Sequence, residues 1–214
     1  STKYLHLHPS PPAVLDSALQ FGGASGALEI PFSTEFLSLF ETKVRNIVNE
    51  NWTIYIKTTL GLGLGSGDRT LAEFGKLFHL YFGADKKLNA TVNGSADDPG
   101  ETITTDSALT VGTEYEIALT RESDGNATLR YTTGGTTVSK TAAIPQNTTL
   151  DLRRAYNFLL GAKETQDPGS YYSGSVTKCA LYPFNVVTDA GNDGALFYFD
   201  FTAGKYEDCL LYTS

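Results

Sequence analysis

Residues 115–132, YEIALTRESDGNATLRYT, decide the fold class of this chain. Two runs of alternating apolar and polar residues, 115–121 and 128–132, flank a turn that contains Asp124 and Gly125. An Asp-Gly pair between alternating runs is the strongest short-range signal for a β-hairpin. Because alternation with period 2 gives one buried and one solvated face, this stretch predicts an antiparallel sheet.

Similar patterns extend outward from the hairpin in both directions. Residues 52–58 alternate strictly, with Trp52, Ile54 and Ile56 on one face. Further strands are expected at 17–21, 27–31, 77–82, 88–92, 138–142, 158–161, 174–182 and 195–201. Helical spacing of apolar residues occurs only near residues 33–48, where a short helical segment is expected. Since no strand–helix–strand alternation is present, the chain is predicted to be an all-β sandwich of two antiparallel sheets.

The size and composition of the chain fit one such domain. A length of 214 residues is within the range of a single all-β sandwich, and 41% hydrophobic residues suffice for a core. Residues 1–12 end in a proline-rich stretch and are expected to form an extended N-terminal arm. Residues 13–214 are expected to form the sandwich. The first residues lack the apolar core of a secretory signal, which leaves a processed end and a cytoplasmic start both open.

The charge of the chain narrows the class of partner. Sixteen Lys and Arg residues against 24 Asp and Glu residues give a net charge of −8, and the basic residues are scattered. Binding to nucleic acid or to an anionic membrane surface depends on a basic patch, so neither partner is expected. No apolar run approaches the roughly 18 residues of a membrane helix, so no membrane insertion is expected. A glycan or a protein surface fits better.

The order of four motifs resembles the laminin-G-like branch of the concanavalin A-like jelly rolls. The matching segments are 18–22 with 28–31, 52–57, 112–134, and 159–161 with 172–176 and 180–182. They span roughly residues 17–201, and Tyr115 stands where this branch usually has Trp. The resemblance implies a jelly-roll topology for the sandwich. It also relates the chain to lectins, adhesion modules, glucanases and polysaccharide lyases.

Cysteine pairing and calcium binding are further expectations. From spacing alone, Cys179 and Cys209 are equally compatible with a disulfide and with two separate core thiols. Members of the family that this chain resembles often have a cysteine pair near the C-terminus. The resemblance therefore implies a Cys179–Cys209 disulfide. Relatives also bind Ca²⁺ at the rim of the sandwich through aspartates and carbonyl oxygens. The acidic loops available for this are Asp97 with Asp98, and Asp189 with Asp193.

The sequence argues against an enzyme. A retaining glycosidase needs two carboxylates about 5 Å apart, and the glucanase branch supplies them as Glu-x-Asp-x-x-Glu or Glu-x-Asp-x-Glu. Neither spacing occurs, and the nearest pair, Glu114 and Glu116, lacks the third acid. The arginine, glutamine and histidine strands of the lyase branch are also absent. No catalytic residue is therefore assigned.

Two adjacent tyrosines are the leading candidates for ligand binding. A sugar site needs an exposed aromatic face that stacks on the ring, flanked by amides or carboxylates. Tyr171 and Tyr172 follow a predicted turn. Asp193 is the candidate carboxylate that would form hydrogen bonds to the sugar. The alternative for Tyr172 is a structural role before Gly174. His6 and His8, which only His79 can join, are interpreted as part of a flexible arm rather than a metal pair.

Three functions remain open from the sequence. The preferred hypothesis is a non-catalytic recognition or adhesion module that binds a glycan or a protein surface through rim loops. The alternative is a structural component of a virion surface or fibre, as a homo-oligomer or within a larger assembly, with the N-terminal arm contacting neighbours. A polysaccharide hydrolase or lyase is the third. An extracellular, cell-surface or virion-surface location fits the first two.

Overall fold

The computed structural model describes residues 6–7, 13–15, 18–24, 26–30, 51–62, 67–75, 77–92, 100–144, 157–163 and 169–203. Several sequence predictions lie outside these residues. They are the helical segment at 33–48, most of the N-terminal arm, Asp97, Asp98 and Cys209. Within the arm, His6–Leu7 forms strand β1, which pairs with β4 (Leu28–Ile30).

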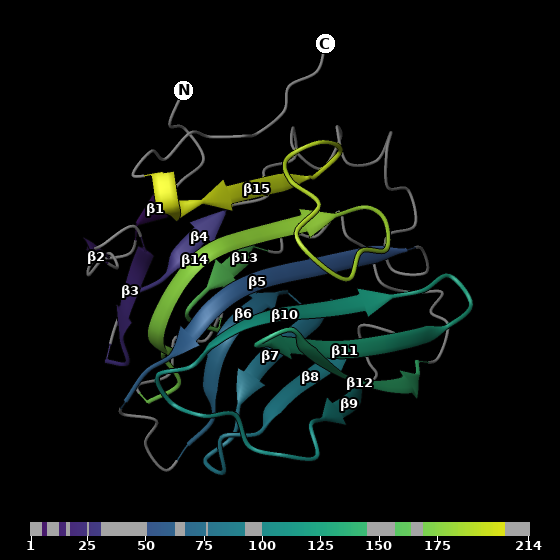
Figure 1. The fold of residues 1–214 in the computed structure, drawn as a ribbon, viewed down its shortest axis with the longest axis horizontal. Helices are drawn as coiled ribbons and strands as arrows, with labels where there is room; N and C mark the ends of the chain where they lie inside the picture. Colours follow the sequence, from purple (N-terminus) through teal and green to yellow (C-terminus); the bar gives the residue numbers. More distant parts are fainter. Residues whose placement is uncertain are drawn as a thin grey trace.

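The described chain forms two antiparallel sheets that pack face to face (Figure 1). The first has the order β12-β11-β10-β5-β14-β3-β2, with β15 paired to β14. Its strands are β2 (Ala13–Leu15), β3 (Ala18–Gly22), β5 (Trp52–Leu60), β10 (Glu114–Arg121), β11 (Asn126–Thr133), β12 (Thr136–Ala143), β14 (Ser173–Tyr182) and β15 (Phe197–Asp200). A 3-10 turn, η1 (Phe201–Ala203), follows β15.

The second sheet has the order β1-β4-β13-β6-β7-β8-β9. Its remaining strands are β6 (Arg69–Phe74), β7 (Phe78–Phe82), β8 (Leu88–Val92), β9 (Glu101–Thr104) and β13 (Phe158–Leu160). The predicted all-β, two-sheet antiparallel jelly-roll sandwich is therefore confirmed. Among the described residues, no helix has the length and apolar character needed to cross a membrane.

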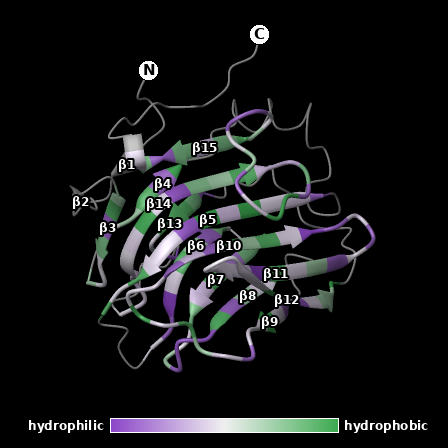
Figure 2. Ribbon diagram, in the orientation of Figure 1, coloured by the Kyte–Doolittle hydropathy of each residue, from purple (hydrophilic) through white to green (hydrophobic). Residues whose placement is uncertain are grey.

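The hairpin that dominated the sequence pattern forms as expected. β10 and β11 pair from Glu116 with Thr132 to Arg121 with Ala127, and Gly125 adopts a φ of 95° in the turn. The side chains of Tyr115, Ile117 and Leu119 face the core, as the alternation predicts. Figure 2 shows the same alternation of hydrophilic and hydrophobic residues along the strands of this sheet.

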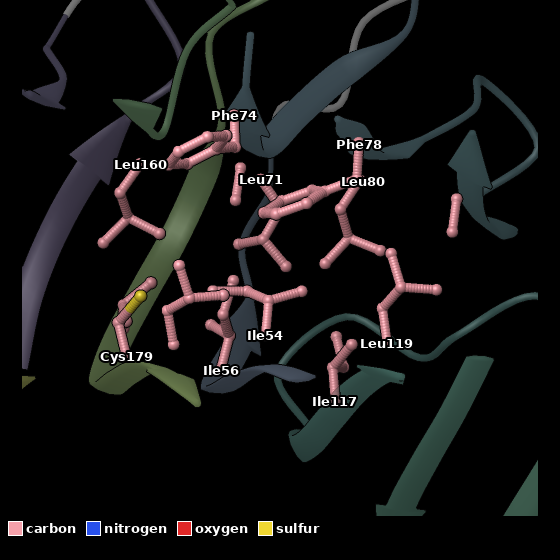
Figure 3. Close-up of a cluster of buried hydrophobic side chains, with 14 of the residues drawn as sticks. Ile54, Ile56, Leu71, Phe74, Phe78, Leu80, Ile117, Leu119, Leu160 and Cys179 are labelled. Carbon is pink, nitrogen blue, oxygen red and sulfur yellow. The ribbon is translucent and has the colours of Figure 1, made fainter. Parts of the chain in front are cut away.

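The core lies between the two sheets. Figure 3 shows Ile54, Ile56, Ile117 and Leu119 of the first sheet facing Leu71, Phe74, Phe78, Leu80 and Leu160 of the second. All of these side chains are at most 2% exposed. Burial of this apolar surface supplies the main driving force for folding. The inner faces of both sheets are thus committed to stability, and binding groups must come from outer faces, edges and loops.

Candidate functional site

The loop of residues 183–196, which joins β14 to β15, folds across the outer face of the first sheet (Figure 1). Thr53 of β5 fastens it at two points. The Thr53 hydroxyl donates to the carbonyl oxygen of Phe184 at 3.0 Å and accepts from the Val186 N–H at 3.1 Å. Thr120 of β10 donates to the carbonyl oxygen of Val186 at 3.4 Å. Two threonines on neighbouring strands therefore fix the start of the loop.

A small apolar cluster supports the same loop. Tyr55, Ala180, Tyr182 and Ala195 are buried on the outer side of the sheet, with Phe184, Val186 and Tyr198 packed against them. The Tyr182 hydroxyl donates to the carbonyl oxygen of Gly191 at 2.8 Å. Because these contacts join the loop to β5 and β14, the loop is a fixed part of the surface.

An ionic network built on Asp189 closes the far side of the loop. Lys178 of β14 donates to the Asp189 carboxylate at 2.5 Å, and Gly191 N–H and the Tyr198 hydroxyl donate to it as well. Burial would raise the pKa of Asp189, but the hydrogen bonds from Lys178 and Gly191 outweigh it and lower that pKa. The same bond to Asp189 raises the pKa of Lys178. Both groups are therefore charged at neutral pH, and Asp189 serves as an anchor.

An open cleft of about 380 Å³ lies between the loop and the ends of strands β10 and β11. Thr120, Glu122 and Arg130 line it from β10, β11 and the turn between them, and residues 185–188 with Ala190 line it from the loop. Its polar groups are two hydroxyls, one amide, one carboxylate and one guanidinium. Val187 adds an apolar side chain that is 57% exposed. This volume is within the range of small-molecule sites in proteins, but the lining is more polar than is usual for such sites.

Alternation along β10 and β11 places Arg130 at the cleft and Arg121 in the interior. Arg130 of β11 faces outward and donates to the Thr120 hydroxyl at 3.4 Å. Arg121 lies opposite Trp52 in the strand register and is 1% exposed. Among the described residues its guanidinium has no hydrogen-bond partner. Burial lowers the pKa of Arg121. Since neighbouring residues of a strand point to opposite faces, Thr120 belongs to the cleft and Arg121 to the interior.

The carboxylates considered for catalysis are engaged in other contacts. Glu114 pairs with Lys57 at 3.2 Å, and Glu116 accepts a hydrogen bond from the Tyr55 hydroxyl at 3.0 Å. Burial, and then the neighbouring Glu116 carboxylate, raise the pKa of Tyr55. A raised pKa makes the phenol a poorer source of a nucleophilic oxygen at neutral pH. This arrangement does not supply the pair of available carboxylates that glycoside hydrolysis needs.

The structure corrects the prediction for Tyr172. Its side chain is fully buried, and its hydroxyl lies 2.7 Å from the Thr58 hydroxyl inside the sandwich. Tyr171 is half-buried and packs against the cluster of Ala27, Leu159 and Ala162. Tyr172 therefore cannot stack on a sugar, and its structural role is the correct interpretation. Both tyrosines also precede β14, whereas the cleft lies beyond its C-terminal end.

The two loop aspartates for which calcium binding is predicted have different surroundings. Asp193 is exposed in the loop, and the Asp189 carboxylate is already bound by the Lys178 ammonium. A cation at this carboxylate would be repelled by that ammonium group. No cluster of three or more His, Cys, Asp or Glu residues that could hold a metal is present in the described part of the chain. Asp97 and Asp98 lie outside that part.

Cys179 is a free, fully buried thiol among the described residues. It belongs to the core cluster between the sheets, where Figure 3 shows its sulfur among aliphatic side chains. Burial raises the pKa of this thiol, which makes it unreactive. The proposed partner, Cys209, lies outside the described residues.

His79 is a structural residue of β7. Its Nε2 lies 2.8 Å from the Thr70 hydroxyl, and its ring stacks on Tyr81 at a centroid distance of 4.5 Å. In the sheet order, β4, β13 and β6 lie between β1, which contains His6, and β7. Three strands therefore separate the backbone of His79 from that of His6.

We expect neutral His79 to stabilise the fold until the solution becomes acidic. Burial, with a smaller effect from Lys163, lowers its pKa from 6.5 to about 4. As the pH falls, His79 takes up its proton near pH 6.5 in the unfolded chain but only near pH 4 in the folded chain. The stability that is present above pH 6.5 is therefore lost as the pH falls to about 4. The loss should be about 2–3 kcal/mol. Urea unfolding of the wild type and of His79→Gln between pH 7 and 4 measures it, and equal slopes for both proteins would contradict it.

Comparisons with known proteins define the fold and no further. No family model matches the chain, and no curated protein matches its sequence. Full-length tailspike protein 2 from Escherichia coli O157:H7 bacteriophage CAB120 aligns over 94% of this chain and 30% of its own, with a TM-score of 0.59 and 12% identity. The enzymatically active domain of bacteriophage CBA120 tailspike protein 2 aligns over 94% and 33%, with a TM-score of 0.60 and 13% identity.

A sialidase provides a third structural match. Trypanosoma rangeli sialidase in complex with 2,3-difluorosialic acid aligns over 86% of this chain and 28% of its own, with a TM-score of 0.56 and 17% identity. The chain thus spans about a third of the length of these structures or less. At such identities the likeness shows a shared β-sandwich fold and leaves function to be argued from the site.

Proposed function

We propose that the chain is a non-catalytic recognition module that binds a glycan in the cleft beside the loop of residues 183–196. The observation on which the proposal depends is the cleft itself, because hydrogen bonds from Thr53 and an ionic anchor at Asp189 hold its loop wall in place. A preformed wall lowers the entropy lost when a ligand binds. The occurrence of similar sandwiches within a phage tailspike and a sialidase supports this proposal.

The cleft lining has groups suited to a sugar. Asn185 can donate and accept hydrogen bonds, Thr188 offers a hydroxyl, and Glu122 can accept bonds from neighbouring sugar hydroxyls. The described residues that line the cleft include no aromatic side chain, so the exposed side chain of Val187 would contact the C–H surface of a sugar ring in place of the expected aromatic face. The proposed role is therefore recognition, and any chemical step would be performed elsewhere in a larger protein.

A glycan array followed by calorimetry tests this function. We expect at least one glycan to bind, and Asn185→Ala to weaken it about tenfold, the effect of one lost hydrogen bond. Ser107→Ala, an exposed change in the loop between β9 and β10, at the opposite end of β10 from the cleft, should leave the affinity unchanged. Titrations in calcium and in EDTA test the calcium site predicted at Asp97 and Asp98. Absence of binding to every glycan, or equal affinities for Asn185→Ala and wild type, would contradict the proposal.

The second candidate is a structural role in an assembly such as a virion surface. The observation that favours it is β12, which ends the first sheet and is exposed along nearly its whole length. Such an edge can pair with a strand of another chain. A defined multimer in light scattering, combined with no glycan binding, would favour this role over recognition.

A further inference from the structure

We infer that the sugar recognised in this cleft carries a carboxylate, and that Arg130 is the residue that binds it. This inference rests on the proposed glycan-binding function and specifies the substrate class. It is derived from the ion pairs of the described residues: the lysines on the same sheet each have a carboxylate partner, whereas Arg130 has none.

Arg130 lacks a counter-charge within the described structure. The contact given for its guanidinium is the neutral Thr120 hydroxyl at 3.4 Å, which is a long hydrogen bond. None of the ion pairs formed among the described residues involves Arg130. The guanidinium therefore retains most of its donors for another group, at a position where it lines a cleft.

The lysines of the same sheet are paired, which makes Arg130 distinctive. Lys57 pairs with Glu114 at 3.2 Å, Lys140 with Asp106 at 2.7 Å and Lys178 with Asp189 at 2.5 Å. In a chain of net charge −8, acidic partners are plentiful. A cation that lines a cleft and still lacks one is suited to an anionic ligand.

The geometry of a guanidinium selects a carboxylate in particular. Its planar fork presents two parallel N–H donors that match the two oxygens of a carboxylate, and such charge-assisted pairs are among the stronger hydrogen bonds. Glu122 lines the same cleft without pairing to Arg130. The negative charge of Glu122 would repel the ligand carboxylate. Its carboxylate oxygens would instead accept hydrogen bonds from the sugar hydroxyls. The ligand would then lie with its acid group toward Arg130 and its hydroxyls toward Glu122.

Matched acidic and neutral sugars test the inference. The probes are trigalacturonate against galactotriose, and 3′-sialyllactose against lactose, so that uronic acids and sialic acids are distinguished. At least one acidic probe should bind the wild type at least tenfold more tightly than its neutral counterpart. Arg130→Gln should weaken that acidic probe about 10- to 100-fold and leave the neutral one nearly unchanged. Calorimetry measures each affinity, and circular dichroism confirms that the variant is folded.

Lys140→Gln is the matched control, because it removes a cation of the neighbouring strand β12 that is paired with Asp106 and does not line the cleft. It should leave the affinity for the acidic probe unchanged, whereas Arg130→Lys should recover only part of the affinity. If both acidic probes bind no more tightly than the neutral ones, or if Arg130→Gln leaves the acidic affinity unchanged, the inference is wrong. Binding of neutral glycans that depends on Asn185 would then still support the proposed function. Absence of all glycan binding would reject both.

Discussion

Gly174→Ala is expected to lower the free energy of unfolding by about 4 kcal/mol, because it combines backbone strain with overlap in a packed interior. Gly174 has a φ of +145°, a conformation that L side chains rarely adopt. An alanine Cβ would lie 2.4 Å from the Thr59 carbonyl oxygen and 2.6 Å from the Tyr172 hydroxyl. Neither atom can move freely, since one is backbone of the central strand β5 and the other is buried.

The hydroxyl of Tyr172 explains why this position is a glycine. It lies 2.7 Å from the Thr58 hydroxyl and donates to the Thr59 carbonyl oxygen at 3.3 Å. A side chain at Gly174 would displace the phenol from these partners and leave polar groups unpaired in the core. The cost would therefore extend beyond the overlap itself.

Gly22→Ala provides the matched control on the neighbouring strand. Gly22 pairs with Ser173, has no atom within 4 Å of an added Cβ and does not have a positive φ. Its replacement should be neutral or stabilise the fold by about 0.4–1 kcal/mol. Urea unfolding gives the free energy of unfolding of the wild type, Gly174→Ala and Gly22→Ala. A cost below about 1 kcal/mol for Gly174→Ala would contradict the described contact between Gly174 and Tyr172.

The strands of the sandwich were predictable where alternation is regular. β10 and β11 follow the period of 2 without interruption, and their pairing agrees with the Asp-Gly turn. β6 was not predicted, because its register shifts between Thr70 and Ala72. Such a bulge places the adjacent Leu71 and Ala72 in buried positions, which removes the alternation from the sequence.

Tyr172 shows why a local pattern can assign the wrong role to a side chain. A tyrosine after a turn is expected to be exposed, but the missing side chain at Gly174 makes room for its ring and hydroxyl inside the sandwich. That space depends on β5, which is more than a hundred residues away in sequence. Periodicity carries no information about such a contact.

The cleft was equally hidden from the sequence. Its walls come from residues 120–130 and 185–190, which approach each other because Thr53 binds the loop between β14 and β15. Asp189 belongs to an acidic loop in the sequence, and its role as an anchor depends on Lys178 of β14, 11 residues earlier in the chain. One available signal was the outward position of Arg130 in the alternating strand, opposite Ala118.

Phe78→Ala is the second change with a large expected effect, about 3–5 kcal/mol of lost stability. Phe78 of β7 is fully buried. Its ring centroid lies 5.3 Å from that of Trp52 in the opposite sheet. Within its own sheet, the centroid distances are 6.2 Å to Phe74 and 6.5 Å to Phe158. Alanine would remove one of the aromatic contacts between the two layers and leave a cavity among aromatic rings.

The expected loss at Phe78 can be separated from a general effect of mutation. Trp52 is the one tryptophan of the chain, so fluorescence follows unfolding and also reports the altered packing of Phe78→Ala as a shift in native emission. Phe78→Leu retains an apolar group at this position and should cost about 1–2 kcal/mol. Val138→Ala, at a 40% exposed position on β12, should stay within about 0.5 kcal/mol of the wild type. Equal stabilities for Phe78→Ala and Val138→Ala would mean that Phe78 does not join the sheets, because a cavity at their interface must cost more than a lost surface group.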